Sequence, residues 1–221
     1  MKQPKETHLQ LDEPSLENVP SYEQLEANLR HLTEVTPITF DVNFTFSVMF
    51  SEIFQNEMPS YELKSGVFGA SRSGWTYHTA IAIAQICKIL NLNCRFEAMG
   101  KRDAIIESKG EKPEVFLVAE WEWDYDDIFG SGKELDKLKT TCKTHKSADA
   151  FLLTYCPISK YADFLQRIAG EWIGKVKRKE ASALYLHVLT FDDKSSYRNF
   201  RRLKTVTIHQ DGINIWNDTF L

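Results

Sequence analysis

The sequence predicts an α/β protein in which a mixed central sheet is flanked by helices. Two observations carry this prediction. Apolar stretches with β-branched residues follow one another through short polar turns between residues 94 and 123, and later apolar stretches alternate with segments of helical spacing. Strands joined by short turns pair antiparallel, whereas strands joined by helices run parallel, so both kinds of pairing are expected in one sheet.

The first part of the chain predicts an N-terminal helical extension. Residues 1–20 hold three prolines and are expected to form a flexible leader. Ser21 is a capping residue with acids close behind it, which predicts a helix start. Residues 38–53 are rich in Phe and Val and predict an extended piece, followed by a short helix near 48–55.

The central part predicts a buried helix and three strands. Residues 76–92 are apolar on nearly all sides, which is typical of a helix inside the protein. A strand at 94–99 follows, and then a hairpin whose arms are Asp103–Glu107 and Val115–Ala119, separated by a polar loop with a Gly and a Pro.

The last part predicts an alternation of helices and buried strands. The expected elements are a helix at 133–146, a strand at 148–156, a helix at 161–176, a strand at 182–191 and a hairpin over 203–217 that turns at Asp211-Gly212. We therefore expect residues 21–221 to form a single domain with its core at roughly 75–190.

The hairpin carries three acids that the chemistry of a metal site needs. Asp103 opens the first arm, and Glu120 and Glu122 end the second. Side chains alternate along a strand, so Glu120 and Glu122 share one face, while Trp121 and Trp123 are expected to pack against a helix on the other. Acids late in an apolar strand are costly to bury unless a cation lies between them.

This arrangement resembles the PD-(D/E)xK nuclease superfamily, which has the restriction-endonuclease-like fold. The match is Asp103, followed by Val118-Ala119-Glu120-Trp121-Glu122 at the end of the next strand. Glu122 stands where the family usually has Lys, an ending that resembles the Bam-type restriction enzymes, and Arg102 stands where the family usually has Pro. The resemblance implies a restriction-endonuclease-like core and a metal-dependent endonuclease that hydrolyses phosphodiester bonds in DNA, in restriction or defence.

The resemblance also implies roles for individual residues. Asp103 and Glu120 would hold Mg²⁺ or Mn²⁺, together with the backbone carbonyl of Trp121. Glu122 would act as the general base, which makes Asp103, Glu120 and Glu122 the catalytic set. Glu97, on the preceding strand, is a candidate fourth acid or a plain exposed residue.

The distribution of charge allows a nucleic-acid partner. Residues 1–62 hold 3 basic and 11 acidic residues, whereas the rest of the chain has a net charge of +4 within an overall −4. The candidate phosphate contacts are Lys101, Arg102, Lys133 and Lys137. DNA is the expected partner, with RNA not excluded, and the sequence leaves open whether two copies pair.

Composition points to a cytoplasmic protein without a membrane span. No apolar run reaches 18 residues, the start of the chain lacks the apolar region of a secretory signal, and the four cysteines show no CxxC spacing. The cysteines are therefore expected to be reduced thiols.

Three alternatives to the nuclease stay open. The three acids could form a solvated strand edge. The same fold could serve as a catalytically inactive module for nucleic-acid binding or assembly. The acidic N-terminal segment could instead bind a basic protein partner.

Overall fold

The computed structural model describes residues 41–57, 71–99, 102–174, 182–192 and 200–220, which belong to one compact unit. The predictions for residues 1–20 and for the helix at Ser21 lie outside the described residues. The elements are α2 (Val42–Glu57), α4 (Arg72–Ile89), β1 (Asn93–Ala98), β2 (Arg102–Glu107), β3 (Val115–Glu122), α5 (Glu134–Thr144), β4 (Asp149–Pro157), a 3-10 turn (Ile158–Lys160), α6 (Tyr161–Ile173), β5 (Leu184–Phe191), β6 (Phe200–His209) and β7 (Gly212–Phe220).

The protein is an α/β protein built on one mixed sheet, as predicted. Its seven strands lie in sequence order, from β1 at one edge to β7 at the other. The meander β1–β2–β3 and the strands β5–β6–β7 pair antiparallel, while β3, β4 and β5 pair parallel. The carboxyl ends of the three parallel strands therefore meet at the same edge of the sheet.

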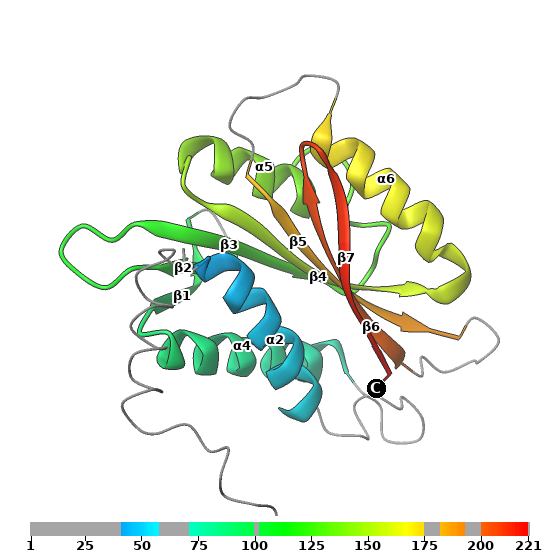
Figure 1. Ribbon diagram of the computed structural model, residues 1–221, viewed down its shortest axis with the longest axis horizontal. Coiled ribbons are helices and arrows are strands. Elements are labelled where there is room, and N and C mark those ends of the chain that lie inside the picture. Colours follow the sequence, from blue (N-terminus) through cyan, green and yellow to red (C-terminus); the bar gives the residue numbers. More distant parts are fainter. Residues whose placement is uncertain (1–40, 58–70, 100–101, 175–181, 193–199, 221) are drawn as a thin grey trace, which may run out of the picture. The chain divides into compact units, whose positions relative to one another are not determined.

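Helices cover both faces of the sheet (Figure 1). The connection from β3 to β4 runs through α5 and that from β4 to β5 through α6, and both helices pack on one apolar cluster. The other face carries a second cluster, to which α2 and α4 contribute. Among the described residues, no helix is long and apolar enough to cross a membrane.

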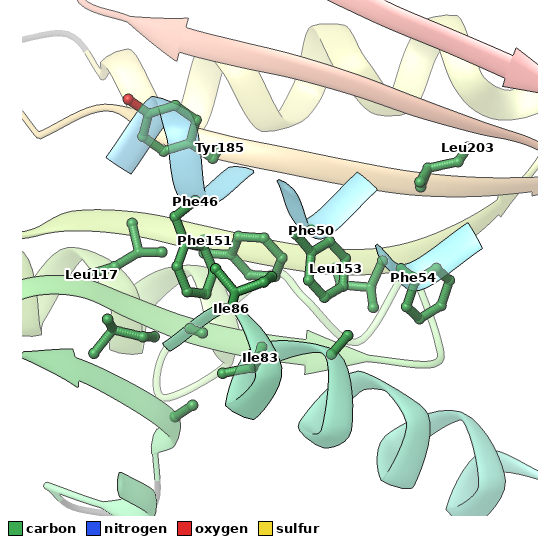
Figure 2. Packing of buried hydrophobic residues seen from close by; sticks show 14 of the residues in the cluster. Phe46, Phe50, Phe54, Ile83, Ile86, Leu117, Phe151, Leu153, Tyr185 and Leu203 are labelled. Carbon is green, nitrogen blue, oxygen red and sulfur yellow. The ribbon is translucent and has the colours of Figure 1, made fainter. Parts of the chain in front are cut away.

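The helix predicted near residues 48–55 is present, but it begins earlier, so the extended piece predicted before it is wrong from residue 42 onward. Val42–Glu57 is one continuous helix, whose start is capped by Asp41 through a 2.9 Å hydrogen bond from the backbone N–H of Phe44. Phe46, Phe50 and Phe54 follow at intervals of four, and Figure 2 shows them on the same side of α2, against Phe151 of the sheet. Burial of this aromatic stripe outweighs the strand preference of the Phe and Val side chains.

The buried helix α4 begins four residues earlier than predicted. Ser71 accepts a hydrogen bond of 3.0 Å from the backbone N–H of Gly74, and this cap places Arg72 in the first turn. Ile83 and Ile86 of α4 face the phenylalanines of α2 in the same cluster (Figure 2). The helix thereby supports the face of the sheet opposite to the candidate acids.

Candidate metal centre

The hairpin sets Asp103 beside Glu120. In the antiparallel pair β2–β3, Ala104 lies opposite Ala119 and Ile105 opposite Val118. Continuing this register by one residue places Asp103 opposite Glu120. Oδ2 of Asp103 accepts a 2.7 Å hydrogen bond from the backbone N–H of Trp121, which fixes the carboxylate across the two strands. Asp103 and Glu120 also act on each other's pKa, as expected of two acids that lie side by side.

Glu120 is buried without full compensation. Glu120 is 1% exposed, and its Oε1 atom has no hydrogen-bond partner among the described residues. Burial and the nearby charge of Asp103 raise the pKa of Glu120 to about 8, although Lys137 and Arg102 act in the opposite direction. Burial likewise raises the pKa of Asp103 to about 6, while the N–H of Trp121 lowers it. An unpartnered, buried carboxyl oxygen is the type of group that a bound cation would satisfy.

Helix α5 brings a lysine to the acids. Nζ of Lys137 lies 3.9 Å from Oε2 of Glu120 and 2.9 Å from Oε1 of Glu134. Thr141, one turn further along the helix, accepts a 2.7 Å hydrogen bond from Nε of Arg102, and this nitrogen lies 3.7 Å from Oε1 of Glu120. Residues three, four and seven apart share one face of a helix, so α5 presents Glu134, Lys137 and Thr141 together.

Glu122 faces the same side but has a different environment. Its Oε1 accepts a 2.9 Å hydrogen bond from the backbone N–H of Asp124, so it closes the turn after β3. Burial and the charge of Glu134 raise the pKa of Glu122. In the part of the chain that the structure describes, no group of three or more His, Cys, Asp or Glu side chains is arranged to hold a metal ion. The converging acids are therefore Asp103 and Glu120, and Glu122 lies at their margin.

The other acid proposed from the sequence, Glu97, is exposed on β1. Its backbone has a φ of 51°, which interrupts the regular strand opposite Asp103. The charge of Glu97 contributes to the raised pKa of Asp103, so the two side chains influence each other. Of the two roles that the sequence left open for Glu97, the structure shows an exposed residue whose charge reaches Asp103.

The predicted phosphate contacts differ in their surroundings. Lys101 lies outside the described residues. Arg102 is 9% exposed, with its guanidinium turned towards Thr141 and Glu120, so it acts inside the site rather than on the surface. Lys133 is exposed and lies 3.1 Å from Asp127.

The phase of β3 agrees with the alternation expected from the sequence. Trp123 is 4% exposed, and its indole N–H donates to Oγ1 of Thr76 on α4 at 3.0 Å. Its ring lies 5.3 Å from that of Trp75. Trp121 is half-buried against the same cluster and next to Phe96. Both tryptophans thus pack on the α4 face, opposite the face that carries the acids.

Comparison with known proteins gives no family for this chain. No family model matches it, and no curated protein is similar to it in sequence. The function therefore has to be argued from the site itself.

The residues of the site suit one hard divalent cation. Mg²⁺ commonly binds one or two carboxylates and completes its shell with waters and phosphate oxygens. Asp103 and Glu120 supply such a pair, and the unpartnered Oε1 of Glu120 is an available ligand atom. Lys137 adds a positive charge beside the pair, where a phosphate could be held.

Proposed function

We propose that this protein is a metal-dependent nuclease with a restriction-endonuclease-like core, and that it hydrolyses phosphodiester bonds in DNA. The observation that carries the proposal is the pair Asp103 and Glu120, in which a buried carboxyl oxygen of Glu120 has no hydrogen-bond partner among the described residues and Lys137 lies 3.9 Å from the other oxygen. Groups with strongly shifted pKa values that gather at one place are typical of functional sites.

The order of the elements supports the same proposal. A helix leads into the antiparallel meander β1–β2–β3, and α5 then crosses to the parallel strand β4. One acid lies early in β2 and the other late in β3. This is the placement that the resemblance to the PD-(D/E)xK superfamily implies.

The chemistry divides among the residues of the site. A divalent cation, when bound, lowers the pKa of a coordinated water and neutralises charge on the phosphate. Asp103 and Glu120 are its carboxylate ligands, with the carbonyl of Trp121 as a further ligand. The family motif usually has a lysine where this chain has Glu122. Lys137 supplies the positive charge for the phosphate instead. Glu122 is the candidate base, since burial and Glu134 raise its pKa.

A calorimetric titration with MnCl₂ tests this proposal, paired with cleavage of plasmid and of random-sequence DNA. We expect binding and Mn²⁺-dependent cleavage that EDTA abolishes. Glu120→Gln should lose both, whereas the matched control Glu107→Gln should keep both. Glu107 is also a buried acid of the hairpin, but it pairs with Arg95 at 2.8 Å, away from the site. Absence of Mn²⁺ binding, even with DNA present, would overturn the nuclease proposal.

The second candidate is a non-cutting nucleic-acid-binding module of the same fold. The position of Glu122, outside the contact between Asp103 and Glu120, favours it. In that case DNA would bind equally well with Mn²⁺ and with EDTA, and Glu120→Gln would leave binding unchanged.

A further inference from the structure

A pocket opens at the carboxyl ends of the parallel strands β3 and β4. It lies between the turn that follows β3 and the start of α6, and its volume is about 250 Å³. Its lining includes Tyr125, only three residues after Glu122, and Lys160, which directly precedes α6. Ligands of α/β proteins commonly bind just outside the carboxyl ends of parallel strands.

The wall of the pocket is a fixed set of aromatic rings. Phe164 of α6 meets Tyr125 edge-on at 6.0 Å and Phe129 at 5.9 Å. The guanidinium carbon of Arg167 lies 3.7 Å from the centre of the Phe129 ring, and Nε of Arg167 lies 3.6 Å from Oε1 of Glu171. The Arg167 side chain is still 54% exposed, so one side of the guanidinium remains open.

Phe129 and Phe164 are buried, so the surfaces open to a base are the half-buried ring of Tyr125 and the exposed side of the Arg167 guanidinium. Arginine guanidinium planes and aromatic rings are the groups on which unpaired bases stack in proteins that bind single strands. Asp126 and Asp163 in the lining offer acceptors for exocyclic amino groups, and Lys160 adds a charge suited to a phosphate. The volume is below the roughly 300–1,000 Å³ of pockets for drug-sized ligands, so it suits a single ring system rather than a base pair.

We propose that this pocket binds one unpaired nucleobase of the nucleic acid whose backbone lies at Asp103 and Glu120. The inference rests on the proposed function and makes it narrower, because a base can enter the pocket only if it is unstacked. The preferred substrate is then a single strand, a flap or a distorted site, and an intact duplex binds more weakly.

Binding of fluorescein-labelled oligonucleotides, followed by anisotropy in Ca²⁺ at fixed salt, tests the preference. The probes are a single-stranded DNA, an RNA of the same sequence and the DNA duplex. We expect single strands to bind at least tenfold more tightly than the duplex, and the DNA and RNA arms show which backbone is preferred. Equal or tighter binding of the duplex would overturn the inference.

Substitutions locate the base. Arg167→Gln and Lys160→Gln each remove one charge at the pocket, and Arg201→Gln removes one from an exposed position on β6. Stacking contributes about 1–3 kcal/mol per base, so Arg167→Gln should weaken single-strand binding about 5- to 150-fold. Arg201→Gln should give only the small loss expected of one surface charge. Lys160 is exposed, so Lys160→Gln should fold, and its effect on single-strand binding tests the pocket even if Arg167→Gln unfolds. Equal losses of single-strand affinity in all three variants would overturn the proposal that the pocket binds a base.

A photocrosslink gives a readout that separates the pocket from the metal centre. A single strand carrying 5-iodouracil should crosslink to the peptide that holds Tyr125 and Phe129, or to α6. Crosslinks found only in other peptides would overturn the proposal that the pocket binds a base. They would not bear on Mn²⁺ binding at Asp103 and Glu120, which is measured separately. Conversely, crosslinking in the pocket together with absent Mn²⁺ binding would support the base site and overturn only the nuclease.

Discussion

The change Glu120→Gln should make the metal-free protein more stable at neutral pH. Glu120 has a folded-state pKa of about 8 against an ordinary value of 4.5. Between these two values the unfolded chain releases a proton that the folded protein retains, so stability is lost as pH rises. At pH 7 the gap is about 2.5 pH units, and at about 1.4 kcal/mol per unit the loss is about 3 kcal/mol. Glutamine does not ionise and escapes this loss.

Urea unfolding, monitored by tryptophan fluorescence in EDTA at pH 4, 5.5, 7 and 8, measures the effect. The wild type and Glu120→Gln should have similar stabilities at pH 4, where Glu120 is protonated in both states. The variant should then become the more stable of the two by a margin that widens up to pH 8. Glu107→Gln is the control, and it should be less stable than the wild type at pH 7, because it loses the ion pair with Arg95.

A constant difference between wild type and Glu120→Gln from pH 4 to pH 8 would refute this reasoning. It would mean that Arg102 and Lys137 compensate the buried charge fully. Addition of Mn²⁺ extends the test, because a cation bound by Glu120 should stabilise the wild type at pH 7 and leave Glu120→Gln unaffected.

Three further predictions concern residues around the site and the core. Lys137→Gln should lower cleavage about 10²- to 10³-fold in single-turnover assays while Mn²⁺ still binds, because positive charge is lost where the phosphate is held. His187 is fully buried, with Nε2 2.7 Å from Oγ of Ser47, and burial lowers its pKa to about 3. Below pH 6.5 only the unfolded chain takes up this proton, so stability should fall by about 2 kcal/mol between pH 6.5 and pH 5. The fall is best measured in the Glu120→Gln background, which removes one opposing titration, although the raised pKa values of Asp103 and Glu122 still oppose it. NMR should show a neutral His187 ring at pH 5. Trp123→Phe should cost about 1 kcal/mol in urea unfolding, because the hydrogen bond to Thr76 is lost.

The sequence was sufficient to predict the sheet and the phase of the hairpin. Side chains alternate between the two faces of a strand. Once Val118 is placed on one face, Glu120 must share that face and both tryptophans must lie on the other. Short turns predict the antiparallel pairs β1–β2, β2–β3 and β6–β7, and helical crossovers predict the parallel pairs β3–β4 and β4–β5, whereas the pairing of β5 with β6 was not predicted. Both inferences rest on local patterns, which a single sequence contains.

Helix α2 and the role of Lys137 depend on tertiary contacts that the sequence does not specify. The aromatic stripe of α2 is equally rich in residues that favour strands, and only its packing against Phe151 selects the helix. Lys137 was expected to contact phosphate, as one of several lysines on its helix. The rotation of α5 about its axis decides which lysine faces the acids, and that rotation is set by burial of Leu135 and Leu138.

The electrostatics at Glu120 favour a cation site over a structural ion pair. Lys137 is held at 2.9 Å by Glu134, which keeps it 3.9 Å from Glu120, beyond hydrogen-bond distance. Arg102 directs its Nε towards Thr141. The hydrogen bond of Lys137 thus goes to Glu134 and that of the Arg102 Nε to Thr141. Oε1 of Glu120 lies 3.7 Å from this Nε and has no hydrogen-bond partner among the described residues. A purely structural role would be served better by an uncharged side chain, because the buried acid destabilises the fold at neutral pH. A group that lowers stability and has an unused ligand atom is the arrangement that a bound cation would complete, as the nuclease proposal requires.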